Sequence, residues 1–166
     1  MSGKMSLAVG TCLALLVASP ALASDWKVDD TVSALDGSRT YAATLDSSDT
    51  IRLSAGDDEH ATLVVRCRSN YLEAYIAWPV PVGKDALDMR WRADGGPARP
   101  EVWSVSRDGG ATFSEDARTF LANLANVHHA SFQLVLANFN ALQATFNVTG
   151  ADVIANTAQS ACMRSR

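Results

Sequence analysis

Apolar residues along much of the chain recur in short runs or at every second position, which is the pattern of β-strands. The clearest case is segment 87–92, LDMRWR, where Leu87, Met89 and Trp91 alternate with charged residues. A period of two places the three apolar side chains on one face of a strand and the charged ones on the other. Together with the turn residues between such runs, this pattern predicts a mainly β, antiparallel, sandwich-like single domain.

The other strands are predicted from runs rich in β-branched and aromatic residues. Segments 61–68 and 71–78 form the clearest pair, because Ser69 and Asn70 between them suit the tight turn of a hairpin, where Asn tolerates a left-handed backbone. The remaining expected strands are 26–35, 39–45, 50–53, 101–106, 131–136 and 142–148.

Helical spacing is found in two places. Three apolar residues between positions 120 and 124 predict an amphipathic helix over 115–126, with Ser114 as its N-cap. A second, shorter helix is expected over 152–157, before Cys162. One or two short α-helices therefore accompany the predicted sheet.

The first residues have the layout of a secretory signal peptide. Lys4 precedes the apolar run 5–17, and an A-L-A site ends at Ala23. This order predicts a signal peptide over 1–23 that is cleaved after Ala23, leaving 24–166 as a single exported β-rich domain. The expected location is the periplasm or the exterior of the cell.

Two other interpretations of this segment remain open. A membrane anchor needs roughly 20 apolar residues to cross the bilayer core, and the run is shorter. A lipoprotein would be acylated at Cys12, but most of the apolar run follows that cysteine instead of preceding it. We therefore expect no stable membrane insertion after cleavage.

Two cysteines remain after the predicted cleavage, Cys67 and Cys162. In an oxidising compartment we expect them to form a disulfide that joins the middle of the chain to its C-terminal part. The alternative is a cysteine nucleophile with a histidine base, which needs a free thiol in a polar cleft. Cys67 instead ends the largely apolar run LVVRC, as expected inside a sheet.

The overall charge argues against two classes of partner. The chain has 14 Lys and Arg against 18 Asp and Glu, for a net charge of −4, and the basic residues form no cluster. Nucleic-acid binding draws much of its affinity from basic residues on phosphates, and peripheral membrane binding uses polybasic faces. We therefore expect neither partner.

Metal-ligating residues are sparse. His128 and His129 are adjacent, so on a strand their side chains point to opposite faces, and His60 is the remaining histidine. The acidic segment 57–59 lacks the spaced carboxylates of a calcium loop and is expected to be solvated. The sequence predicts no metal and no cofactor.

No catalytic residue is predicted, because the chain contains no nucleophile elbow, zinc-protease or phosphate-loop motif. A carboxylate pair for glycan hydrolysis has no fixed sequence spacing, so Glu73 and Asp94 stay as an alternative. Cross-strand ion pairs with Arg66, Arg90 and Arg92 explain both carboxylates more simply.

The tryptophans could have either of two roles, ligand stacking or core packing. Exposed indoles stack on sugar rings, whereas in a domain of this size we expect them in the core, with each indole N–H donated to a backbone carbonyl. These residues are Trp26, Trp78, Trp91 and Trp103.

Segment 63–76 resembles a known family. Its residues L-x-V-R-C-x-x-N-x-x-E-x-Y-I are similar to the pattern L-x-[IV]-R-C-x-x-N-x-T-E-x-Y-[IV] of small exported type VI secretion accessory proteins of the VasI/TagO kind. Leu72 stands where that pattern has Thr. The similarity covers about two thirds of the chain after residue 23, and continues through R-x-D-x-G-P at 92–97, W-x-x-S-x-D at 103–108, Phe113, F-x-x-x-G at 146–150 and Cys162.

The resemblance implies a periplasmic β-domain with a disulfide and no catalytic group to carry over. It agrees with a non-enzymatic exported accessory or binding module whose partner is an envelope or secretion-apparatus protein. The polar residues of the predicted strands form the expected interaction face: Arg66, Asn70, Glu73, Tyr75, Arg90 and Arg92.

Two other functions are kept as alternatives. One is an envelope glycan or peptidoglycan hydrolase with Glu73 or Asp94 as its acid. The other is a secreted inhibitor of a foreign enzyme, which would insert segment 57–59 or the turn at Gly109 and Gly110 into the enzyme's cleft.

Overall fold

The computed structural model describes residues 25–35, 37–83, 86–136 and 141–164. The predicted signal peptide and Cys12 lie outside these residues. The described elements are β1 Lys27–Val32, β2 Arg39–Asp46, β3 Ile51–Arg52, β4 Asp58–Glu59, β5 Thr62–Arg68, β6 Tyr71–Ala77, β7 Leu87–Ala93, β8 Arg99–Val105, β9 Ala111–Ser114, α1 Ala117–Leu124, β10 His129–Val135, β11 Ala141–Asn147 and α2 Ala151–Arg164.

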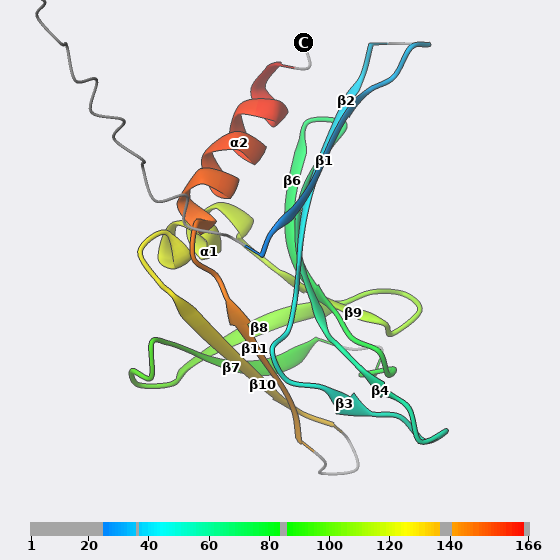
Figure 1. Ribbon diagram of the computed structural model, residues 1–166, viewed down its shortest axis with the longest axis vertical. Helices are drawn as coiled ribbons and strands as arrows, with labels where there is room; N and C mark the ends of the chain where they lie inside the picture. The colour runs from blue at the N-terminus through cyan, green and yellow to red at the C-terminus, as the bar shows by residue number, and fades with distance from the viewer. Residues whose placement is uncertain (1–24, 36, 84–85, 137–140, 165–166) are drawn as a thin grey trace, which may run out of the picture.

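A nine-stranded antiparallel sheet is the frame of the molecule, with the strand order β1-β2-β5-β6-β9-β8-β7-β10-β11. The sheet bends so strongly that β7, β8, β10 and β11 cross beside the half that contains β1, β2 and β6 (Figure 1). The two halves enclose the core, which confirms the predicted mainly β, sandwich-like domain. Both helices lie at one end of it (Figure 1).

The two outer strands of the sheet differ in how they are covered. The segment after β2 lies along β11: the Ser48 N–H donates to the Thr145 carbonyl at 2.7 Å, and Asp49 Oδ1 accepts the Thr145 N–H at 2.8 Å. These bonds bring the far end of the sheet back toward its beginning. β1 pairs with β2 on one side, and all six of its residues are exposed.

Aromatic rings fill the centre of the core. Phe132 on β10 is fully buried, and its ring centroid lies 5.9 Å from that of each of four other rings. Rings at this separation gain contact energy beyond the burial of their area. The four neighbours are Trp91, Trp103, Phe120 and Phe146.

All four tryptophans are buried, as predicted, but their hydrogen bonds differ from the expected ones. The Trp78 indole donates to Thr112 Oγ1 at 3.0 Å, and the Trp91 indole donates to Glu101 Oε2 at 2.8 Å. The indole nitrogens of Trp26 and Trp103 are buried and have no hydrogen-bond partner among the described residues, so the predicted bonds to backbone carbonyls are not found at any of the four.

The predicted hairpin of segments 61–68 and 71–78 is confirmed as β5 and β6. Ser69 and Asn70 have φ values of 50° and 64°, the left-handed backbone that a two-residue hairpin turn requires. Cross-strand pairs run from Arg68 with Tyr71 to Thr62 with Ala77.

The structure differs from the prediction in one strand pairing, one strand that was not predicted and the residue that caps the first helix. Segment 50–53 does not extend the main sheet, because Ile51–Arg52 pairs with Asp58–Glu59 in a separate two-stranded sheet. Residues 111–114 form β9. This strand was not predicted, because it is short and the residues that follow it have helical spacing. Consequently Ser114 ends a strand, and Asp116 caps α1 by accepting the Thr119 N–H at 3.1 Å.

The second helix is more than twice as long as predicted and contains Cys162 instead of ending before it. Its buried face consists largely of small residues, including Ala155, Ala158 and Ala161, which gave no strong apolar signal. Small side chains let α2 lie close to β2, β5 and β6. No helix among the described residues is long and apolar enough to cross a membrane.

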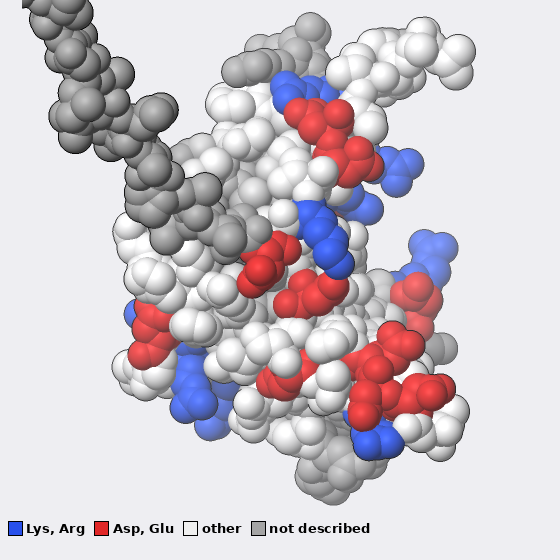
Figure 2. Space-filling model, in the orientation of Figure 1, with Lys and Arg blue, Asp and Glu red and all other residues white. Residues whose placement is uncertain are grey.

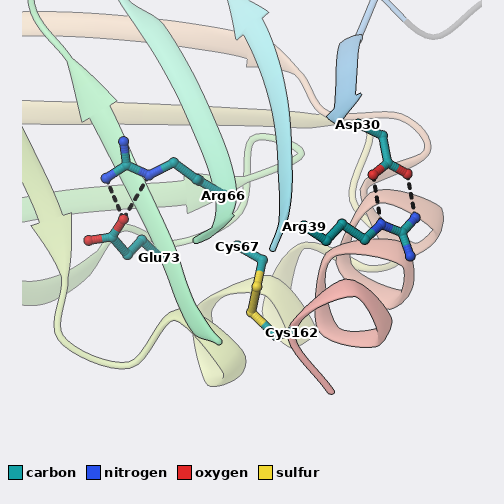
Figure 3. Close-up of a disulfide and its surroundings, with 6 residues drawn as sticks. All are labelled: Asp30, Arg39, Arg66, Cys67, Glu73 and Cys162. Atoms are coloured by element: carbon teal, nitrogen blue, oxygen red, sulfur yellow. Dashed lines mark hydrogen bonds and ion pairs between the residues drawn. A yellow bond between two sulfur atoms is a disulfide. The ribbon is translucent and has the colours of Figure 1, made fainter. Parts of the chain in front are cut away.

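The expected disulfide joins Cys67 on β5 to Cys162 on α2, with 5.5 Å between the two Cα atoms (Figure 3). The residues are separated by 95 positions in the chain. The bond therefore fastens the C-terminal helix to a central strand of the first half of the sheet.

Candidate binding face

The structure divides the predicted interaction face into two parts. Arg66, Glu73 and Tyr75 project from the β5–β6 hairpin, and Asn70 forms its turn. Arg90 and Arg92 project from β7, and β9 and β8 lie between β6 and β7. The sequence placed these residues on strands, but it did not show that two strands separate the groups.

The residues of the β5–β6 part bind one another. Arg66 Nε donates to Glu73 Oε2 at 2.8 Å, which confirms the predicted ion pair (Figure 3). The Arg66 guanidinium also lies 5.3 Å from the centre of the Tyr75 ring, and Tyr75 stacks on Phe113 with 4.7 Å between ring centroids. These contacts stiffen the hairpin and leave the charges of Arg66 and Glu73 paired with each other.

Asp94 does not form the predicted ion pair with Arg90 or Arg92. It lies in the turn after β7 with φ 45°, and its Oδ1 accepts the backbone N–H groups of His129 at 2.7 Å and His128 at 3.1 Å. The hydrogen bond from His129, followed by the one from His128, lowers the pKa of Asp94 from its ordinary value of 3.8. The role seen for Asp94 is to hold the start of β10.

The hydrolase alternative paired Glu73 with Asp94. In the structure Glu73 accepts hydrogen bonds from Arg66, while Asp94 binds backbone at the start of a different strand. A lowered pKa favours the ionised form of Asp94, and a general acid must instead hold its proton near the working pH. Both carboxylates therefore have structural roles that account for them.

Asp94 makes a testable contribution to the pH dependence of stability. A carboxyl group with a lower pKa in the folded chain stabilises the fold above its unfolded pKa, and this contribution is lost as the pH falls through the folded value. We expect Asp94→Asn, whose side chain tolerates the same backbone, to lose less stability between pH 6 and pH 3 than the original protein. Urea unfolding midpoints at the two pH values measure this difference.

Asp88→Asn is the matched control, since it removes one exposed carboxylate that makes no hydrogen bond to a described residue. If Asp94→Asn and the original protein lost the same stability on acidification, Asp94 would not be the group responsible.

The two segments that an inhibitor would insert into an enzyme, 57–59 and the Gly109 turn, both contact other parts of the chain. Asp58 and Glu59 form β4, and Arg52 pairs with Asp58 across that hairpin at 2.8 Å. Gly109 is buried, and its carbonyl accepts the Val82 N–H at 2.8 Å. The Gly109 end of the turn therefore packs against the segment after β6, while Arg107 and Asp108 in the same turn are exposed.

The second part of the predicted face lies on the outer surface of β7, β10 and β11. Arg90 is opposite Gln133, which is opposite Gln143 on the next strand. Residues directly opposite on neighbouring strands point to the same face. A parallel row, two residues further along β7, consists of Arg92, Ser131 and Thr145.

These two rows surround a shallow hollow of about 190 Å³, lined by both arginines, Ser131, Gln133 and Gln143. A neighbouring hollow shares Arg90 and Gln133. Sequence reasoning selected the two arginines but missed the residues of β10 and β11. The alternation of 131–135 placed Gln133 on a polar face, but only the strand order brings it beside Arg90.

Arg90 and Arg92 have no counterion among the described residues, as is also true of Arg68 on β5 and Arg99 on β8, but they alone of these four lie two positions apart on one strand. Lys27, Arg39 and Arg66 each pair with a carboxylate, whereas neither β7 arginine makes an ion pair or hydrogen bond to a described residue. Figure 2 shows basic side chains at the lower left, where β7 and β8 lie in Figure 1, with acidic side chains just above them, and a larger acidic group over the β3–β4 hairpin at the lower right. The β7 face thus carries free positive charge on an acidic protein.

No arrangement of three or more His, Cys, Asp or Glu suitable for a metal ion occurs in the described part of the chain. His60 Nδ1 lies 2.7 Å from the Ser47 carbonyl oxygen, and this contact holds the ring against the backbone.

Comparisons with known proteins show similarity of fold. No family model matches the chain, and no curated protein matches it. Among solved structures, invasion associated protein B from Bartonella henselae superposes with a TM-score of 0.56 at 10% sequence identity. The match covers 86% of this chain and 96% of that one. The two proteins therefore share an architecture over almost the whole of the solved chain.

Proposed function

We propose that the protein is a non-enzymatic, exported accessory of the bacterial envelope that binds a partner protein through the outer face of β7, β10 and β11. The observation that carries this proposal is the pair Arg90 and Arg92, two exposed cations without counterions above a shallow hollow. An unpaired guanidinium is available for bidentate hydrogen bonds to a carboxylate of another molecule. A shallow polar surface suits such contact better than it suits enclosing a small substrate.

Export is supported by two independent features. The signal layout of residues 1–23 directs a chain out of the cytosol. The Cys67–Cys162 disulfide is a bond that persists in the periplasm or outside the cell, where thiols are not kept reduced.

The context that we propose, type VI secretion, rests on the residue pattern similar to VasI/TagO-like proteins. Several residues of that pattern have structural roles in this fold: Cys67 forms the disulfide, Asn70 lies in the hairpin turn, and Arg66 pairs with Glu73. The pattern residues of segment 63–76 therefore serve the scaffold, whereas Arg92, in the later part of the pattern, lies on the proposed partner-binding surface. In a host with such an apparatus, deletion of the gene should reduce effector secretion, and a copy with intact Arg90 and Arg92 should restore it.

Partner capture tests the proposed face directly. The tagged protein is cross-linked in the periplasm, purified and analysed by mass spectrometry beside the double variant Arg90→Glu/Arg92→Glu. We expect a defined partner in the original sample and at least about a tenfold loss of it in the variant, because charge reversal replaces attraction by repulsion.

A matched control is Arg68→Glu/Arg107→Glu, which makes the same charge change at two exposed arginines outside the hollow. The control should keep the partner. Equal capture by all three proteins would reject this face as the interface. Release of soluble fragments from purified peptidoglycan, abolished in Glu73→Gln, would instead support the hydrolase.

A further inference from the structure

The spacing of the two free arginines points to a particular ligand. We propose that this face binds an extended acidic segment of the partner, with carboxylates at alternate residues. The inference rests on the proposed function and adds the chemistry of what is bound. Its basis is the juxtaposition of Arg90 and Arg92 on one strand face with uncharged hydrogen-bonding groups beside each of them.

Alternate residues of a strand lie on the same face and are about 7 Å apart. Arg90 and Arg92 are related in this way on β7, where Trp91 between them points into the core. The same spacing separates the side chains of alternate residues in any extended peptide. A segment running along β7 therefore presents two carboxylates at the interval of the two guanidinium groups.

The neighbouring strands supply groups for the rest of such a segment. Gln133 and Gln143 extend the Arg90 row, and both are exposed. Ser131 and Thr145 extend the Arg92 row, with 3.2 Å between their hydroxyl oxygens. Amides and hydroxyls both donate and accept hydrogen bonds, so Gln133 and Ser131, on the strand next to β7, can bind peptide groups of a segment that runs along β7.

The aromatic residues of this region favour a peptide over a sugar chain or a single-stranded nucleic acid. Sugar rings and bases are commonly bound by stacking on exposed aromatic faces. Trp91 and Phe132 line the hollow, but both side chains belong to the core, with 3% and 0% of their surface exposed. The described lining of the hollow thus offers charge and hydrogen bonds without a stacking surface.

Asp88 lies at one end of the surface that is proposed to bind acidic residues. It lies two residues before Arg90 on the same outer face, is exposed, and lines the neighbouring hollow. A third alternate carboxylate on this side would be repelled. The face therefore selects two acidic residues opposite Arg90 and Arg92, with an uncharged or basic residue opposite Asp88.

Two labelled, end-capped peptides of identical composition test the inference: TTETETT, with alternate glutamates, and TTTEETT, with adjacent ones. Fluorescence anisotropy is measured with the protein purified from the periplasm. In an extended peptide adjacent glutamates point to opposite sides, so only one meets an arginine. We expect TTETETT to bind about tenfold more tightly, since it keeps one more charge-assisted contact.

The variants separate site binding from general charge attraction. Arg90→Glu/Arg92→Glu and the milder Arg90→Gln/Arg92→Gln should each weaken TTETETT binding by about tenfold or more, while Arg68→Glu/Arg107→Glu should leave it unchanged. Equal affinity for both peptides, or equal loss in the control variant, would overturn the inference.

Failure of the inference is distinguishable from failure of the proposed function. If partner capture depends on Arg90 and Arg92 but TTETETT does not bind, the acidic-segment inference is rejected and the proposed binding face stands. If an oligogalacturonate binds with the same arginine dependence and TTETETT does not, the ligand is an anionic glycan and the inference is rejected.

Discussion

Replacing both Cys67 and Cys162 with alanine is expected to lower the free energy of unfolding by about 4 to 5 kcal/mol. The bond closes a loop with a sequence separation of 95, so its loss gives the unfolded chain much conformational freedom. It also frees α2 from the covalent contact with β5 that holds it on the sheet. Urea unfolding followed by tryptophan fluorescence measures the change, because all four indoles are buried.

Reduction supplies the control for this experiment. Dithiothreitol should destabilise the original protein to a similar extent and should leave the double alanine variant unaffected. A double variant with the same unfolding midpoint as the oxidised original would show that packing alone holds α2 in place.

Phe132→Ala is expected to cost about 3 to 5 kcal/mol of stability, because it leaves a cavity among four rings that have few ways to close it. Gln133→Ala, at the next position of β10, removes an exposed side chain and should change stability by less than about 0.5 kcal/mol. Urea unfolding of the two variants measures both values. A cost for Phe132→Ala as small as that for Gln133→Ala would mean that the surrounding rings repack.

The fold could be predicted where local patterns determine it. Alternation identified β7, and Ser69-Asn70 identified the β5–β6 hairpin, since both depend on residues close in sequence. β9 was missed because its four residues are too few to show a clear strand alternation, and a helical run follows them. The length of α2 was missed because its contact with the sheet uses alanines, whose burial depends on the surface opposite them.

The candidate site was predicted only in part, because it depends on strand order. Arg90 and Arg92 are outward residues of a strand that the sequence indicates clearly. Their separation from Arg66 by β9 and β8, and their position beside Gln133, follow from long-range pairing. The role of Asp94 is similar: its hydrogen bonds exist because β10 begins beside the β7 turn.

The exposed strand β1 has a consequence for self-association. Its outer edge carries backbone groups of the kind to which a strand from another copy can add. When the same outer edge of two copies pairs in antiparallel fashion, residues of the same face and hydrogen-bonding class lie opposite each other, so overlap of the strand centres places Asp29 opposite Asp29 or Asp30 opposite Asp30. Like charges directly opposite destabilise such a pair. The acidic residues at the centre of this strand therefore oppose edge-to-edge aggregation and help to keep copies of the protein apart.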